Sequence, residues 1–284
     1  MAKKIHIVVI TIFLISFFSC LRKKEVIETA RKPASLVNTK VLKPEFQSII
    51  DSSGVVGSIL IYDLEKDKYY SNDFEWSTTS NLPASTFKIP NSIIGLETEV
   101  IKSDSTLFKW NGRKRSFKIW EQDLVLNKAF QYSCVPCYQE VARDIGVKRM
   151  NHYVEKLKYG NLKIDTTNID NFWLEGESRI NQMQQIDFLK RFYTDALPIS
   201  KRTKQIMRTI MLIKETDSYK LSGKTGLSIS NETYNGWFVG YIELKNKIYF
   251  FATNLEPQNG FKLNAFIEKR KNLTLAAFKE MGLL

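Results

Sequence analysis

The sequence predicts an α+β fold in which strands from both ends of the chain form one antiparallel sheet, flanked by helices, with a mainly helical lobe between them. β-Branched and apolar runs lie at residues 54–70 and 219–253, whereas apolar residues recur at three- to four-residue spacing through residues 87–213. With 284 residues, 43% of them hydrophobic and 25% charged, the chain can bury a sizeable core and is neither fibrous nor disordered. We expect a site in the cleft between sheet and lobe.

Each element has its own local pattern. Pro44 suits the first turn of a short helix, and the run 54–62, with a turn at 65–67 and a return at 68–70, predicts a hairpin. Helices of the lobe are expected at 119–130, 135–145, 151–157, 186–193 and 201–213. The remaining expected elements are strands at 219–225, 235–244 and 247–253 and a closing helix at about 263–281.

The N-terminal segment differs from the rest in composition. Lys3 and Lys4 precede an almost continuous apolar run that is too short for a comfortable membrane span and has the layout of a secretory signal. We therefore expect a signal peptide at 1–19, a tether at 20–43 and the main folded domain at 44–284, with the helical lobe at about 87–213.

The end of the apolar run also carries a candidate lipidation site. Ser19-Cys20 is similar to the lipobox of bacterial lipoproteins, in which the cysteine becomes the lipidated first residue, although Phe17 departs from the usual leucine. Ordinary cleavage nearby and an uncleaved anchor are the alternatives. We expect an exported, periplasmic protein of a Gram-negative-type bacterium, anchored to the membrane if Cys20 is lipidated.

Charge and histidine content exclude several classes of function. The net charge is +12, and removal of residues 1–19 leaves +10, but the cations are scattered, which favours a solvated basic surface over a nucleic-acid interface. The only histidines are His6, within the expected signal peptide, and His152. A multi-histidine metal site is thereby excluded, and we expect another residue type to supply the base of any serine hydrolase.

The strongest local motif is the Ser85-x-x-Lys88 of the segment 83–91. One helical turn would bring the hydroxyl and the amine onto one face, and a lysine buried among apolar residues can lose its charge and act as a base. By itself this spacing is weak evidence for a catalytic pair, since a serine that caps a helix and an exposed lysine would have the same sequence.

A second motif, Ser222-Gly223-Lys224-Thr225-Gly226, lies on an expected strand. A cation, a hydroxyl and a glycine there can bind a carboxylate and admit a substrate close to the backbone. An ordinary edge strand is the alternative. The order Ser-x-x-Lys and then Lys-Thr-Gly is typical of penicillin-recognising serine enzymes.

Three further motifs follow in the order of a known family. Ser133-Cys134-Val135, Tyr159-Gly160-Asn161 and Phe172-Trp173-Leu174 stand where class D β-lactamases have Ser-x-Val, Tyr-Gly-Asn and a tryptophan-containing loop. With the two motifs above, the chain from about residue 54 onward resembles a class D (oxacillinase-type) serine β-lactamase. The resemblance implies the penicillin-recognising serine enzyme fold and hydrolysis of penicillin-type antibiotics, giving resistance.

The resemblance also implies roles for individual residues. Ser85 would be the nucleophile, and Lys88, carboxylated by CO2 or bicarbonate, the general base. Val135 would keep the pocket dry, and the indole of Trp173 would hydrogen-bond the carbamate. The remaining implied roles are proton transfer by Ser133 and Lys224, an oxyanion hole from the backbone of Ser85 and Leu227, and substrate binding by Thr225, Gly226 and Arg270. No metal is implied.

Other hypotheses stay open at this point. Trp173 and Val135 could be plain core residues, and Tyr159-Gly160-Asn161 a simple turn. Cys134-x-x-Cys137 could be a thiol–disulfide site, and whether these cysteines are bonded is open. A β-lactam-sensing or penicillin-binding domain would acylate without turnover. Substrate range and the choice between monomer and homodimer are not readable.

Overall fold

The computed structural model describes residues 39–230, 233–258 and 263–284. The expected signal peptide, Cys20 and residues 20–38 of the expected tether lie outside the described residues. The last residues of that expected tether do not form a tether: Thr39–Leu42 is strand β1, paired parallel to the strand at Lys68–Ser71. The domain therefore begins a few residues before Pro44.

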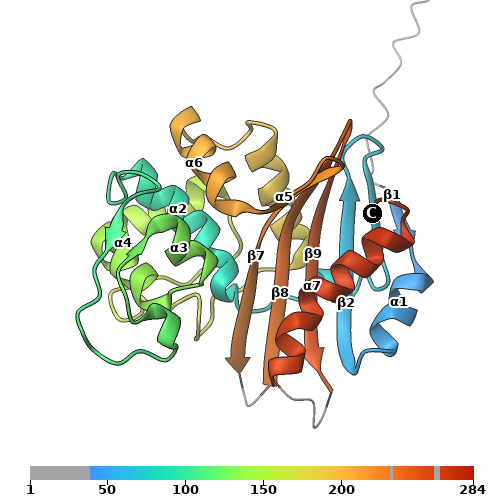
Figure 1. The fold of residues 1–284 in the computed structure, drawn as a ribbon, viewed down its shortest axis with the longest axis horizontal. Coiled ribbons are helices and arrows are strands. Elements are labelled where there is room, and N and C mark those ends of the chain that lie inside the picture. Colours follow the sequence, from blue (N-terminus) through green and yellow to red (C-terminus); the bar gives the residue numbers. More distant parts are fainter. Residues whose placement is uncertain (1–38, 231–232, 259–262) are drawn as a thin grey trace, which may run out of the picture. The chain divides into compact units, whose positions relative to one another are not determined.

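One sheet joins the two ends of the described chain, as the sequence predicts (Figure 1). Its strands, in spatial order, are β1 (Thr39–Leu42), β3 (Lys68–Ser71), β2 (Val55–Asp63), β9 (Lys247–Pro257), β8 (Thr233–Leu244), β7 (Tyr219–Ser230) and β6 (Leu212–Glu215). β2 runs antiparallel to β9, with Val55 opposite Pro257 and Asp63 opposite Tyr249. The expected α+β architecture is confirmed.

Helices cover both faces of the sheet. On one face lie α1 (Pro44–Asp51) and α7 (Leu263–Glu280), which bury Phe46 and Phe278 in a shared apolar cluster. On the other face lies α5 (Gln182–Tyr193), whose Gln182 side chain donates hydrogen bonds to the carbonyls of Ser58 and Ala252. α5 therefore packs directly on the sheet, although it lies within the middle segment expected to form the helical lobe.

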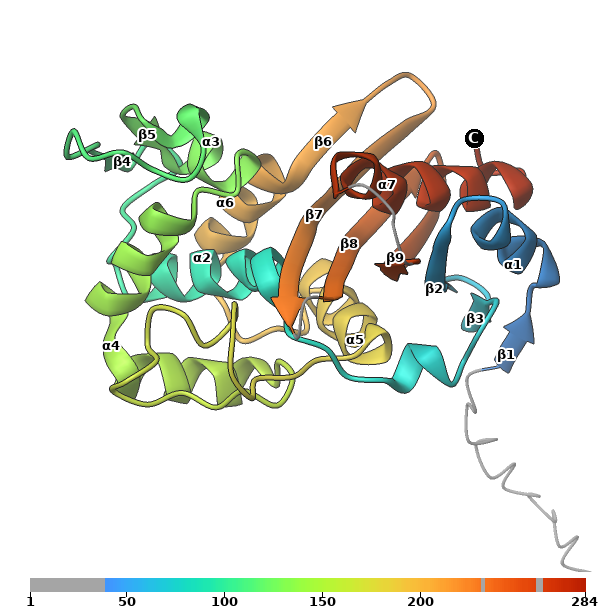
Figure 2. The ribbon, with the colours of Figure 1, turned by 90° about the horizontal axis from the view of Figure 1, so that it is seen from below.

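The remaining elements form the helical lobe, which lies beside β6 and β7 (Figure 2). They are the helices α2 (Lys88–Glu97), α3 (Leu126–Gln131), α4 (Val135–Leu157) and α6 (Lys201–Met211), the short hairpin of β4 (Leu107–Phe108) and β5 (Leu124–Val125), and the 3₁₀ turn Lys118–Trp120. Of the other 3₁₀ turns, Trp76–Thr78 contacts β2 and α5, and Ala84–Phe87 contacts β7 and α2. Among the helices of the described ranges, none has the length and hydropathy of a membrane span.

Four of the expected helices differ in the structure. The expected helix 119–130 is a 3₁₀ turn, a strand and the short α3, because Leu124 and Val125 pair with β4. The expected helices 135–145 and 151–157 are one element, α4, interrupted at Gly146, whose φ of 74° only glycine adopts readily. The expected helix 201–213 ends at Met211, because Leu212 pairs with Ser222 of β7.

Candidate active site

The turn that carries Ser85 is held from several sides. Ser85 lies in the 3₁₀ turn Ala84–Phe87, directly before α2, after Ala84 in the left-handed region at φ 49°. The Ala84 backbone N–H donates to the carbonyl of Trp173 at 2.8 Å, and the indole N–H of Trp237 donates to the carbonyl of Leu82 at 2.9 Å. These contacts fix the backbone that leads into the strained residue.

A buried polar network anchors the same turn to α5. Thr86 Oγ1 donates to the carbonyl of Pro83 at 2.6 Å and accepts from Gln185 Nε2 at 2.9 Å. The Tyr159 hydroxyl lies 3.3 Å from Thr86 Oγ1 and donates to Gln185 Oε1 at the same distance. The Tyr-Gly-Asn motif therefore supports the turn. Gln185 was missed by the sequence analysis, because no local pattern links it to residue 86.

Ser85 and Lys88 meet as the spacing predicts. Lys88 Nζ donates to Ser85 Oγ at 3.1 Å, and the lysine side chain is 1% exposed. It lies 5.1 Å from the ring centroid of Tyr138, and among the described residues no carboxylate forms an ion pair with it. Burial without a counter-charge lowers the pKa of Lys88 to about 7. A substantial share of the amine is therefore uncharged at neutral pH.

Trp173 packs on Phe87, which lies between Ser85 and Lys88 in the sequence, and it has an unused donor. Its ring stacks on Phe87, with centroids 5.6 Å apart and an interplanar angle of 24°. The side chain is fully buried, and its indole N–H has no acceptor among the described residues. A buried N–H without a partner is costly, so this donor suits an anionic oxygen placed next to it.

Lys224 connects the sheet to the helical lobe. Its ammonium donates to Ser133 Oγ and, at 3.0 Å, to the carbonyl of Thr225, while lying 5.6 Å from the ring centroid of Phe130. Ser133 occupies the left-handed region at φ 53°, just before α4. The pKa of Lys224 is lowered, first by burial and then by the charge of Lys88. An easily lost proton beside a hydroxyl is what a proton relay requires.

The edge of β7 faces the Ser85 turn. Pairing with β6 ends at Ser222, so the edge from Gly223 onward has no strand beside it. A β-carbon on Gly226 would lie 3.2 Å from the methyl carbon of Thr86 and 3.3 Å from the Pro83 carbonyl oxygen. Any side chain here would press on the Ser85 turn, so glycine suits this close approach of the strand, and Leu227 follows directly on β7.

Arg270, which lies on α7, also holds the backbone of β7. Its guanidinium donates to the carbonyl of Gly226, and its Nε donates to the carbonyl of Ile267 at 2.9 Å. The side chain is 5% exposed, and burial lowers the pKa of Arg270 to about 10, so it keeps its charge at neutral pH. Arg270 thus lies next to the Thr225–Gly226 segment, as the resemblance implies. Its contact with substrate stays a prediction.

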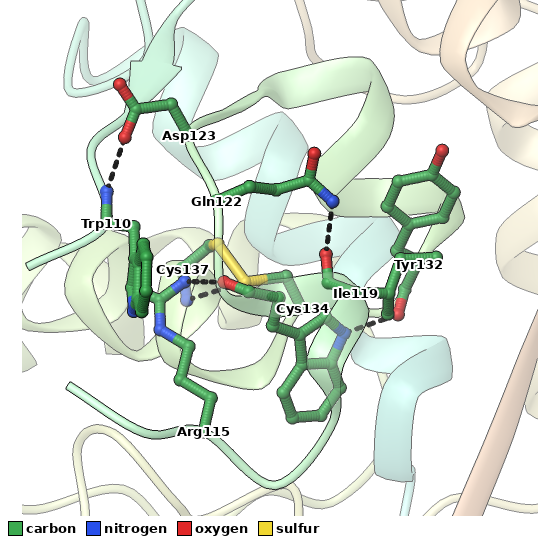
Figure 3. Close-up of a disulfide and its surroundings, with 9 residues drawn as sticks. Trp110, Arg115, Ile119, Gln122, Asp123, Tyr132, Cys134 and Cys137 are labelled. Carbon is green, nitrogen blue, oxygen red and sulfur yellow. Dashed lines mark hydrogen bonds between the residues drawn. A yellow bond between two sulfur atoms is a disulfide. The ribbon is translucent and has the colours of Figure 1, made fainter. Parts of the chain in front are cut away.

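Cys134 and Cys137 form a disulfide, which answers a question that the sequence left open. Figure 3 shows it among Trp110, Arg115 and Ile119 of the loop before α3. Cys134 also caps α4, because its sulfur accepts a hydrogen bond from the Cys137 backbone N–H. Both sulfurs belong to fully buried residues, so a partner thiolate has no access, which disfavours the thiol–disulfide hypothesis.

The structure thus brings together most of the predicted residues. Val135 lies between the bonded cysteines and packs, partly buried, against the lobe's core. His152 is exposed on α4, as expected for a surface residue. Within the described residues no cluster of His, Cys, Asp or Glu could hold a metal. The arrangement combines a hydroxyl, a buried amine and a second lysine–serine pair, which suits acyl transfer through a serine.

Comparisons with known proteins point the same way. A sequence profile described as penicillin binding protein transpeptidase domain matches residues 25–275. β-Lactamase OXA-10 from Pseudomonas aeruginosa is 43% identical over 196 residues, covering 68% of this chain and 73% of that protein. β-Lactamase OXA-48 from Klebsiella pneumoniae is 40% identical over 215 residues, covering 75% and 81%. The structure of the class D β-lactamase YbXI from Nostoc matches at a TM-score of 0.81 and 42% identity, covering 84% of this chain and 99% of that one.

Proposed function

This chain belongs to the class D β-lactamases, and we propose that it hydrolyses penicillin-type antibiotics through an acyl-enzyme on Ser85. Membership of the family makes it a serine hydrolase of the β-lactam ring. The observation that carries the assignment of Ser85 is the 3.1 Å hydrogen bond between Ser85 and a lysine buried without a counter-charge. A serine hydroxyl becomes a useful nucleophile only when a nearby group takes its proton.

Lys88 is the base in this proposal, and its surroundings fit the carboxylated form. An amine must be uncharged to react with CO2, and burial lowers the pKa of Lys88 to about 7. The ring of Trp173 stacks on Phe87, and its unpartnered indole N–H is a donor available to a carbamate oxygen. A carbamate on Lys88 would supply an anionic oxygen base next to the serine hydroxyl. Val135 helps to exclude water from the pocket.

The remaining residues act on the substrate itself. Ser85 Oγ bonds to the lactam carbonyl carbon, the ring C–N bond breaks, and the nitrogen takes a proton from Ser133, which is replenished through Lys224. The backbone N–H groups of Ser85 and Leu227 stabilise the oxyanion, a contribution of about 3 kcal/mol per donor. Water then hydrolyses the ester and restores Ser85.

The substrate carboxylate binds beside residues 225–226 of β7. Thr225 offers a hydroxyl, Gly226 lets β7 lie close to the Ser85 turn, and Arg270 contributes positive charge to this part of β7. The resulting substrate is a small molecule with a carboxylate beside a strained amide.

Localisation is part of the proposal. The charged start, the apolar run and Ser19-Cys20 support export to the periplasm, with a lipid on Cys20 as the anchor. An enzyme in that place would meet β-lactams before they reach their targets.

Labelling and turnover test the assignment. Ser85→Ala should abolish the covalent penicillin adduct seen by intact-protein mass spectrometry, because the attacking oxygen is gone. Lys88→Ala should severely impair acylation and stall any acyl-enzyme that forms. Lys148→Ala, an exposed lysine on α4, is the matched control and should behave as wild type. Full turnover by the Lys88 variant would contradict the assignment, and one burst of product without continued turnover in the wild type would indicate a sensor.

A further inference from the structure

A second recess adjoins the cleft where β6 leaves β7. Its volume is about 270 Å³, and it is open to solvent beside Lys224 and Thr225. One wall is apolar and comes from Phe130 and the Leu212–Ile213 pair, while Lys271 lies on the other wall. The recess therefore shares Thr225 with the proposed carboxylate site and Lys224 with the proposed proton relay, and Ser85 does not line it.

The apolar wall contains a bulged residue. The register between β6 and β7 shifts between Leu212 and Lys214, so Ile213 has no partner opposite it. Its side chain is 44% exposed although it is large and apolar. Bulges beside active sites commonly redirect a side chain, and here the bulge leaves Ile213 lining the recess.

The cationic wall is distinct from Arg270. The guanidinium of Arg270 is buried and donates to Gly226 and Ile267, which makes it a support of β7. The next residue, Lys271, lines the recess, and no carboxylate of the described residues forms an ion pair with it. Its charge also contributes to lowering the pKa of Lys224, which agrees with the closeness of the two amines.

We propose that this recess is a specificity subsite for an apolar substituent carried beside the carboxylate of a β-lactam, with Ile213 as its contact residue and Lys271 as a second cation that attracts the carboxylate. The inference rests on the proposed function and extends it. Substrates whose substituent reaches the recess gain burial against Ile213. Substrates that carry only a methyl group there do not reach it.

Two cephalosporins with the same acyl side chain test the Ile213 contact, one with a methyl group and one with an aryl-vinyl group at ring carbon 3. Ile213→Ser should lower kcat/KM for the aryl-vinyl compound about tenfold and leave the methyl compound nearly unchanged. Ile119→Ser is the matched control, because Ile119 is also 44% exposed but lies outside the recess. The subsite would be overturned if Ile213→Ser left the ratio of kcat/KM between the two compounds at its wild-type value. It would also be overturned if Ile119→Ser shifted that ratio equally.

Lys271→Gln tests the second cation. It should raise KM about fivefold for both compounds, leave kcat unchanged and weaken the dependence of kcat/KM on salt. Lys279→Gln, an exposed lysine of the same helix, removes the same charge outside the recess. Equal effects of the two lysine variants would contradict the role of Lys271.

Binding to an acylation-deficient chain separates this inference from the proposed function. In the Ser85→Ala background, calorimetry should show tighter binding of the aryl-vinyl compound than of the methyl compound, and Ile213→Ser should remove the difference. Absence of that difference would overturn the subsite even if the wild type turns over β-lactams. Absence of turnover and labelling in the wild type would instead overturn the proposed function.

Discussion

Replacing Trp173 by Phe removes the donor that we propose for the Lys88 carbamate and keeps an aromatic ring that can pack on Phe87. The indole N–H is buried without an acceptor, so in the uncarboxylated protein its loss breaks no hydrogen bond among the described residues. A hydrogen bond to a charged group contributes about 1.5–3 kcal/mol, which corresponds to a factor of about 10 to 150 in CO2 affinity. We therefore expect the bicarbonate concentration for half-maximal activity to rise by that factor.

The assay is steady-state penicillin hydrolysis across a bicarbonate titration, with urea unfolding measured in parallel. The smaller ring should lower the free energy of unfolding by only about 1–2 kcal/mol. Trp76→Phe is the control, because it removes a 2.9 Å bond from the indole N–H to Asn254 Oδ1 away from the pocket and should leave the bicarbonate dependence unchanged. A Trp173→Phe enzyme with wild-type bicarbonate dependence would refute the reasoning.

Three further predictions concern pH, the disulfide and the approach of β7. Because burial lowers the pKa of Lys88 to about 7, the amine is charged below that pH and neutral above it, so kcat/KM should rise with pH through about 7; a profile flat from pH 5 to 9 would be inconsistent with a lysine base. Cys137→Ser opens the short loop closed by the bond to Cys134 and should lower the free energy of unfolding by about 2 kcal/mol in urea titrations. Dithiothreitol should not destabilise the variant further, because the variant has no disulfide left to reduce; a further loss of the same size would argue against the bond as the cause. Gly226→Ala places a β-carbon 3.2 Å from the Thr86 methyl carbon, so thermal unfolding should show a free energy of unfolding lower by about 1–3 kcal/mol. Acylation by penicillin should also be slower, and unchanged acylation would mean that the position of the strand is not critical.

The elements that the sequence predicts well are those whose pattern is local and long. The strand at residues 54–62 and the closing helix lie close to their expected limits. Leu212 and Ile213 continue the apolar spacing of the helix before them, yet they form a strand because β7 offers an edge, and no local pattern reveals that partner. The pairing of Thr39–Leu42 with β3 is likewise a tertiary contact within a polar stretch.

The contacts of the site also divide into those that local spacing predicts and those that depend on tertiary packing. Ser85 and Lys88 are one turn apart, so their contact follows from spacing alone. The Lys224–Ser133 bond spans 91 residues, and only the family resemblance linked the two motifs in advance. The Cys134–Cys137 spacing allowed a disulfide without requiring one. Lys271 was not distinguished from other surface cations, because its position beside Lys224 depends on how α7 packs along the sheet.

The most direct test is carbon-13 NMR of the protein in labelled bicarbonate, which observes a carbamate on lysine without relying on turnover. We expect a protein carbamate resonance in the wild type and in Ser85→Ala that is absent in Lys88→Ala and fades as the pH falls below about 7, because the amine then becomes charged. An active wild-type enzyme with no such resonance at pH 8, or a resonance that persists in Lys88→Ala, would contradict the assignment of Lys88 as the carboxylated base.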